Sequence, residues 1–323
     1  MYTQFVDLQL KHYPLIIVIL FMAMILYIKL ANKLNIIDKP NERSSHNYLT
    51  VRGGGVVWWI SGILYSMLNI QESIYFLAGL TLISTISFWD DISSLSSKIR
   101  IVVHFLMVSI LFYGFGVFQA LPWWQILIAY ILAVGTLNGF NFMDGINGNT
   151  GLYSLVVLIV LQYINIRMIN FTPLHFINFA ILASFVFLLF NYRTEAKCFA
   201  GDVGSMAIGF WILTLLTQLM LATHSLIWIF FLTIYGVDSG CTILHRLYLE
   251  QNIFKPHRMF FFHVMVNERG LSNLKISACY ALVQFVICFV IIYSYINSTT
   301  IAWISGAGML ILCCLCYLLK FEK

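Results

Sequence analysis

Long apolar segments constrain the fold of this chain more than any other feature of its sequence. A membrane-spanning helix needs about 20 largely apolar residues. Hydrophobic residues make up 61% of the chain and charged residues 10%, against about 25% charged residues in a soluble domain. The sequence therefore predicts an all-α polytopic membrane protein, a single domain over residues 1–323, with eleven spans. They cover about residues 13–31, 53–70, 73–89, 101–118, 122–138, 151–169, 173–191, 205–222, 226–242, 275–296 and 299–319.

The distribution of lysine and arginine predicts how these spans are oriented. All but two of the 18 basic residues fall on one side of the membrane if the N-terminus is outside, and the exceptions are Lys11 and Arg167. Basic residues favour the cytoplasmic side, so the C-terminus is predicted to be cytoplasmic. The net charge of +5 then reflects topology, and no nucleic acid partner is expected. Five cytoplasmic connections remain to carry chemistry: 32–52, 90–100, 139–150, 192–204 and 243–274.

The connection 139–150 holds polar residues that a lipid-facing helix would not carry. Asn141 and Asp144 lie three residues apart, so they share one face if the segment is helical. A buried carboxylate or amide at membrane depth needs a partner. Gly145, Gly148 and Gly151 leave room for a backbone or a ligand to come close. The alternative is a polar helix cap with small residues packed between helices.

Two adjacent aspartates, Asp90 and Asp91, end the third expected span. Two neighbouring carboxylates ionise together comfortably only beside a cation. That cation is either a divalent metal ion or the nearby Lys98 and Arg100, which would give a salt-bridged loop. Adjacent residues on a helix do not face the same way, so the two aspartates are expected to have different roles.

Two further motifs stand at the starts of expected helices. Arg52 precedes the glycines 53–55, where free backbone N–H groups and the helix dipole suit an anion; a solvated basic loop is the alternative. Asp202 lies within Gly201–Ser205, where backbone donors can serve a phosphate and the carboxylate can serve Mg²⁺. Asp202 as an ordinary helix N-cap is the alternative there.

The long connection 243–274 carries basic residues and histidines, including His257, Arg258 and His263. These suit a diphosphate; a basic segment that attracts anionic lipid is the alternative. The phenylalanines 260–262 are expected at the membrane interface or under the loop, with Arg258 as the main positive charge. Because Mg²⁺ binds few carboxylates plus substrate phosphates, the acidic and basic motifs together predict phosphate transfer between a soluble and a lipid phosphate.

Four motifs carry a resemblance to a known family: Asp90-Asp91, Asn141-Phe-Met-Asp144-Gly, Gly201-Asp202-Val-Gly-Ser205 and Pro256-His257-Arg258. In order and spacing, over about residues 36–270, they resemble the polyprenyl-phosphate N-acetylhexosamine-1-phosphate transferases. The resemblance is closest to the bacterial branch that starts lipopolysaccharide O-antigen or other surface polysaccharides. The phospho-MurNAc-pentapeptide transferase of peptidoglycan synthesis is a more distant relative.

The resemblance implies transfer of N-acetylhexosamine-1-phosphate from a UDP-sugar to undecaprenyl phosphate, with release of UMP, at the cytoplasmic face of the bacterial inner membrane. It implies Mg²⁺, or Mn²⁺ in its place, on Asp202, with Asp90 and Asp91 as catalytic residues beside the metal and the lipid phosphate. It leaves a homodimer and the identity of the sugar open. The substrate-binding residues that it implies are Asn141, Asp144, Phe199, His257, Arg258 and His263, and we add two basic residues, Lys98 after the paired aspartates and Arg52 before the glycines 53–55.

Two positions depart from the family pattern. Asn147 stands where relatives often carry a second aspartate, which argues against a metal or base role there. Phe260 stands among the positions where relatives carry histidines, so either His263 substitutes or the loop sits differently. The competing functions are a secondary transporter, which would place its carboxylates near the bilayer midplane in repeated halves, and a non-catalytic lipid-phosphate-binding protein. The motifs lie at helix ends instead, which favours the transferase.

Overall fold

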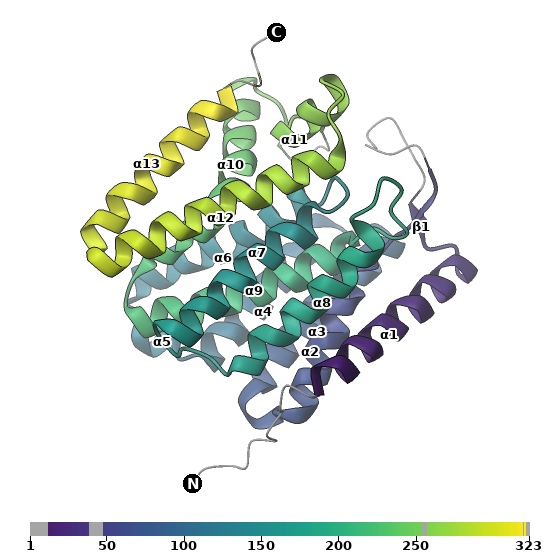
Figure 1. Ribbon diagram of the computed structural model, residues 1–323, viewed down its shortest axis with the longest axis horizontal. Coiled ribbons are helices and arrows are strands. Elements are labelled where there is room, and N and C mark those ends of the chain that lie inside the picture. The colour runs from purple at the N-terminus through teal and green to yellow at the C-terminus, as the bar shows by residue number, and fades with distance from the viewer. Residues whose placement is uncertain (1–11, 39–47, 254–256, 319, 321–323) are drawn as a thin grey trace.

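The computed structural model describes residues 12–38, 48–253, 257–318 and 320, and its helices pack into a bundle (Figure 1). Ten helices of this part are long and apolar enough to cross a membrane, which confirms the predicted all-α polytopic class. They are α1 Tyr13–Lys33, α3 Ile70–Ile92, α4 Ser97–Gly114, α6 Trp123–Met143, α7 Asn149–Arg167, α8 Leu174–Asn191, α9 Gly201–Thr223, the continuous pair of η2 Leu226–Leu232 and α10 Thr233–Tyr248, α12 Asn273–Asn297 and α13 Thr299–Leu318.

The remaining expected span corresponds to α2, Val56–Leu68, which has 13 residues. At 1.5 Å per residue such a helix is about 20 Å long, less than the roughly 30 Å of a bilayer core. It begins at Val56 because residues 53–55 form the turn that leads into it. All eleven predicted apolar helices are thus present, but this one is too short to span by itself.

Helix α9 lies at the centre of the bundle, where it packs against α2, α3 and α6 (Figure 1). Glycines let its neighbours come close. A Cβ atom on Gly55 would lie 2.1 Å from the Cα of Gly204, and one on Gly209 would lie 3.1 Å from the Cβ of Phe140. Small residues allow such approaches between membrane helices. The first turn of α9 is therefore fixed against the start of α2.

Short elements gather at one end of the bundle. Strand β1, Ile37–Asp38, pairs antiparallel with β2, Thr50–Val51, and Val51 also bridges Cys198. The short helix α11, Phe261–His263, continues into the π-helix η3, Val264–Glu268. Figure 1 shows β1 and α11 in the upper part of the view, while α5, Val117–Ala120, lies at the opposite end. The strand pair places Arg52 at the end that the basic residues predict to be cytoplasmic.

Candidate active site

Asp91, near the end of α3, is buried and accepts hydrogen bonds from α9. Its side chain is 0% exposed, and it accepts the backbone N–H of Asp202 at 2.9 Å and that of Val203 at 3.0 Å. The first N–H groups of a helix have no partner within the helix. Asp91 therefore caps α9 from another helix, and this contact fixes the backbone that carries Asp202.

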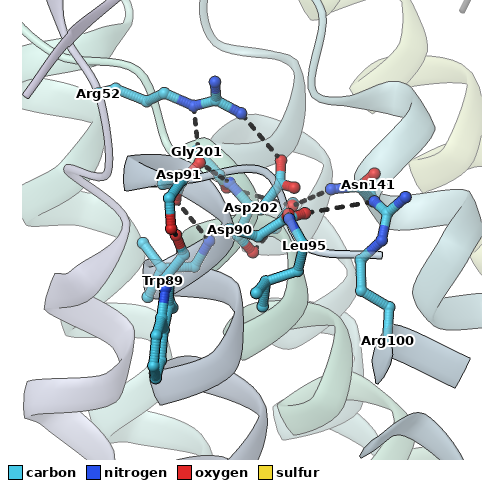
Figure 2. Close-up of polar contacts among 12 residues, drawn as sticks. Arg52, Trp89, Asp90, Asp91, Leu95, Arg100, Asn141, Gly201 and Asp202 are labelled. Atoms are coloured by element: carbon cyan, nitrogen blue, oxygen red, sulfur yellow. Dashed lines mark hydrogen bonds and ion pairs between the residues drawn. The ribbon is translucent and has the colours of Figure 1, made fainter. Parts of the chain in front are cut away.

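Arg52 joins the two acidic motifs. Its Nε lies 2.6 Å from Asp91 Oδ1 and its Nη2 lies 3.3 Å from Asp202 Oδ1, as Figure 2 shows. Burial alone would lower the pKa of the Arg52 guanidinium, but the carboxylates of Asp91 and Asp202 outweigh it, and the pKa is raised. Arg52 therefore stays positively charged among the carboxylates, where an anion can reach its half-exposed side chain.

Asp90 points away from its neighbour in sequence, as expected for adjacent residues on a helix. Its Oδ1 accepts the backbone N–H of Leu95 at 2.5 Å, and its Oδ2 lies 3.3 Å from Arg100 Nη1 (Figure 2). The salt-bridged alternative is thus observed for Arg100, which was not among the predicted site residues. Lys98, which was among them, is exposed at the start of α4.

Asp202 and Asp90 form the part of this cluster that suits a divalent cation. Their carboxyl groups lie close enough to interact, and the side chain of Asp202 is 23% exposed. Among the described residues, no group of three or more His, Cys, Asp and Glu side chains could hold a metal ion by itself. Mg²⁺ commonly uses one or two carboxylates and completes its shell with substrate phosphates and water. The donor set fits such a shared ion.

The glycines after Arg52 do not present free amides to an anion. The N–H of Gly54 donates to the carbonyl of Phe199 at 2.8 Å, and that of Gly55 donates to the carbonyl of Ala200 at 3.0 Å. The anion-binding interpretation of these two N–H groups is therefore wrong for this arrangement. They tie the start of α2 to the turn before α9, so Phe199 takes part through its backbone, and the residue is partly buried.

The asparagine–aspartate motif spans the end of α6. Asn141 lies in the last turn and donates to Ser205 Oγ of α9 at 3.3 Å. Asp144 follows the helix, and its Oδ1 accepts the Thr150 hydroxyl at 2.6 Å. Burial raises the pKa of Asp144 to about 7; the Thr150 hydrogen bond lowers it, and the negative charges of Asp202 and Asp91 raise it further. These charges place Asp144 next to the carboxylate cluster.

The glycines of this motif are in contact with protein side chains. A Cβ on Gly145 would lie 2.6 Å from the Phe262 ring, one on Gly148 would lie 2.3 Å from the Tyr192 ring, and one on Gly151 would lie close to Leu188. Of the two interpretations of these glycines, close packing is the one observed. Gly148 also has a φ of +86°, a conformation that favours glycine.

The last connection folds over the end of α6. The Phe260 ring stacks on Phe142 with 5.7 Å between centroids, and Phe260 and Phe262 are buried, so these two phenylalanines lie under the loop as expected. Burial, followed by nearby positive charge, lowers the pKa of both His257 and His263 to about 4. Both histidines are therefore neutral at pH 7, which supports Arg258 as the main positive charge of the loop. Lys255 and Pro256 lie outside the described residues.

Comparison of the sequence with known proteins identifies several that resemble this chain. Residues 73–221, which include the motifs of Asp90, Asn141 and Asp202, match the model of glycosyl transferase family 4. The chain is 25% identical over 300 residues to the probable undecaprenyl-phosphate N-acetylglucosaminyl 1-phosphate transferase of Bacillus subtilis, covering 86% of this chain and 81% of that protein.

Two further proteins show a similar degree of sequence similarity to this chain. The undecaprenyl-phosphate alpha-N-acetylglucosaminyl 1-phosphate transferase of Yersinia pestis is 28% identical over 295 residues, covering 80% of this chain and 78% of that protein. The protein of that name from Escherichia coli K12 is 28% identical over 294 residues, covering 80% and 77%. The similarity therefore extends well beyond the segment that matches the family model.

Asn147 has a structural role in this chain. Its side-chain amide donates to the hydroxyl of Tyr48 at 3.0 Å and to the carbonyls of Arg193 at 2.8 Å and Thr194 at 3.2 Å. Its own carbonyl accepts the Ser277 hydroxyl at 2.7 Å. An aspartate could not donate these bonds, so the change from the family pattern is accounted for by contacts between loops.

Sequence analysis missed one acidic residue of this chain altogether. Asp238 is 3% exposed in the middle of α10, and it contacts both α12 and the last connection. A signal for it does exist, because Asp238 is the single Asp or Glu within the span Leu226–Tyr248. An ionisable residue inside a membrane span is a functional candidate by default.

Proposed function

We propose that this chain transfers N-acetylhexosamine-1-phosphate from a UDP-sugar to undecaprenyl phosphate at the cytoplasmic face of the bacterial inner membrane. An oxygen of the lipid phosphate attacks the β-phosphorus of the UDP-sugar. The bond between the β-phosphorus and the bridging oxygen breaks, and UMP leaves. The product is a lipid diphosphate-linked sugar, the first intermediate of a surface polysaccharide or cell-wall glycan.

One observation carries this proposal: the end of α3 and the start of α9 bring Asp90, Asp91 and Asp202 together with two arginines. Phosphoryl transfer depends mainly on positioning and on neutralising charge. The names of the relatives supply the lipid acceptor and the transferred group. A transporter is expected to hold its carboxylates near the bilayer midplane, whereas these three stand at helix ends.

We assign different parts of this reaction to the charged residues. Mg²⁺ held by Asp202 and Asp90, together with the substrate phosphates, would neutralise the diphosphate. Arg52 and Arg100 lie at the carboxylates and can contact the incoming phosphates. Asp91 has both oxygens engaged by Arg52 and by the start of α9, which fits a positioning role; a direct catalytic role for it remains a prediction.

No strong general base is required by this reaction. A phosphate monoester carries a charge of about −1.5 to −2 at pH 7, so the lipid phosphate is already a nucleophile. Asp90, which pairs with Arg100, is our candidate to take a remaining proton. Asn141 and Asp144 beside the cluster, and Phe199, remain the candidates for nucleotide contacts.

The test uses purified protein, undecaprenyl phosphate and Mg²⁺ with a panel of UDP-sugars. The panel contains UDP-N-acetylglucosamine, UDP-N-acetylgalactosamine and UDP-linked 6-deoxy-N-acetylhexosamines such as N-acetylfucosamine. UMP release that requires both the lipid phosphate and one of these sugars is the expected result, and the preferred sugar identifies the substrate. Correctly folded protein that releases no UMP with any of them would refute the proposal.

A further inference from the structure

Asp238 is a buried carboxylate with partners on both sides. Its Oδ2 accepts the hydroxyl of Tyr280 on α12 at 2.7 Å, and its Oδ1 accepts the backbone N–H of Phe261 at 2.7 Å. The Thr242 hydroxyl is a more distant donor at 3.4 Å. A buried charge is costly unless it is hydrogen-bonded, and here both oxygens are used. The carboxylate therefore joins α10, α12 and the last connection.

A second set of contacts holds the backbone two residues earlier. The carbonyl of Met259 accepts the Thr242 hydroxyl at 3.4 Å and also the Lys320 ammonium group. Tyr317 lies 2.8 Å from the Thr242 hydroxyl and 2.8 Å from Lys320 Nζ. The carbonyl of Met259 and the N–H of Phe261, which lie on either side of Phe260, are thus both held by hydrogen bonds.

The segment that these contacts hold has little regular structure of its own. Residues 249–253 and 257–260 form turns and irregular backbone, and α11 is three residues long. The segment carries Arg258 and His263, and the positive charge of Arg258 contributes to the lowered pKa of His263. An irregular loop takes its position from its contacts, so Asp238 fixes where these two side chains stand.

We propose that Asp238 is a positioning residue for the diphosphate of the UDP-sugar, acting through the Phe261 backbone on Arg258 and His263. The inference rests on the proposed function. Asp238 itself lies beneath the loop. Misplacing a binding group by about 1 Å can cost on the order of 10²-fold in rate, so this anchor matters for the nucleotide substrate and much less for the lipid phosphate, which the carboxylate cluster of α3 and α9 receives.

The test compares three variants. Asp238→Asn keeps the size of the side chain but leaves one acceptor oxygen where the structure uses two. Tyr280→Phe removes one of the two donors and leaves the carboxylate. Ser239→Ala is the matched control, because Ser239 is the next residue, is also buried, and donates only within its own helix to Tyr235.

Two measurements are made on each purified protein. Steady-state kinetics give kcat and the KM of each substrate separately, and amide hydrogen exchange is followed over residues 257–268 and over α9. For Asp238→Asn we expect kcat/KM for the UDP-sugar to fall about 10- to 100-fold with the KM for undecaprenyl phosphate unchanged. Exchange should accelerate in 257–268 and stay constant in α9. Tyr280→Phe should shift both measurements less in the same direction, and Ser239→Ala should match the wild type.

Three results would overturn the inference. Wild-type kcat/KM for the UDP-sugar in Asp238→Asn would show that the anchor does not matter for the substrate. Unchanged exchange in 257–268 would show that the loop is held in another way. Faster exchange in α9 together with 257–268 would mean that Asp238 serves general packing. If the wild type released no UMP, the proposed function would fail, and the exchange comparison would still decide whether Asp238 anchors the loop.

Discussion

The carboxylate of Asp91 accepts the backbone N–H of Asp202 at 2.9 Å, across 111 residues of sequence. This bond joins the end of α3 to the start of α9 and sets the distance between the two acidic motifs. It separates the roles of the adjacent aspartates, because Asp90 turns instead toward Arg100. The roles of Asp90 and Asp91 can therefore be separated by experiment.

We expect Asp91→Asn to lose stability and Asp90→Asn to lose mainly activity. The side chain of Asp91 is fully buried and accepts from three donors, and leaving a buried donor unsatisfied costs about 1–3 kcal/mol. The thermal unfolding midpoint of the Asp91→Asn variant in detergent should therefore fall. Asp90 pairs with the half-exposed Arg100, and such a pair contributes about 1 kcal/mol or less. Its replacement should cost at least about 10²-fold in rate. Thermal unfolding and UMP release, measured side by side, check both; equal stability losses in the two variants would contradict the division.

Asp202→Asn should abolish transfer while the protein still inserts and folds. The amide keeps the size of the side chain but removes the charge that would hold Mg²⁺ against the diphosphate. The measurement is UMP release over a Mg²⁺ titration, with direct binding of Mn²⁺ as a second readout. Adding Asn147→Asp to the Asp202→Asn variant is a useful contrast. The side chain at position 147 is engaged by loop contacts, so the added carboxylate should not restore metal binding. Near-normal activity of Asp202→Asn in excess Mg²⁺ would refute the metal assignment.

Arg258 should matter more than His263 for transfer. Both histidines of the loop are neutral at pH 7 because burial lowers their pKa values, whereas a guanidinium keeps its charge and can bind a diphosphate through two parallel bonds. Arg258→Lys should impair transfer, and His263→Ala should cost less than Arg258→Ala. An inactive His263→Ala beside an active Arg258→Ala would reverse the ranking and give His263 the role of the missing histidines.

The buried His263 should make stability depend on pH on the acid side. Its pKa is lowered to about 4 in the fold, against about 6.5 when unfolded. Below pH 6.5 the unfolded chain therefore binds a proton that the folded one does not, and the stability present above pH 6.5 is lost as the pH falls toward 4. The free energy of unfolding of His263→Gln should fall by about 3 kcal/mol less than that of the wild type over this range. Thermal unfolding from pH 7 to pH 4 measures it, and parallel curves for the two proteins would show that the histidine titrates normally.

The orientation can be tested by cysteine labelling in a variant without the native cysteines. Single cysteines near Ile70 and Ser298, at the ends of α3 and α12 remote from the candidate site, should react with an impermeant reagent added from outside. Cysteines at Ser96 and Asn252 should not react, and neither should one at Asn47, which lies outside the described residues. Labelling of the connection 243–274 from outside would overturn the cytoplasmic site.

Much of the candidate site could be predicted because its motifs are local. Asp90-Asp91, Asn141 with Asp144, and Asp202 are polar residues at the ends of apolar segments, and this contrast is visible without any tertiary information. Arg100 and Asp238 could not be ranked in the same way, since their importance depends on what faces them. Lys98 and Arg100 look alike in the sequence, yet it is Arg100 that forms an ion pair with Asp90.

The sequence by itself determined the class of this protein, its apolar helices and the residue types that suit phosphate chemistry. Hydrophobic length and charge contrast are properties of short segments, so they can be read one segment at a time. The tertiary structure decided which aspartate is buried, that Arg52 pairs with a carboxylate 150 residues away, and that Asp238 holds the last loop. These depend on distances between segments, and such distances follow from how helices pack, which the composition of a single segment does not specify.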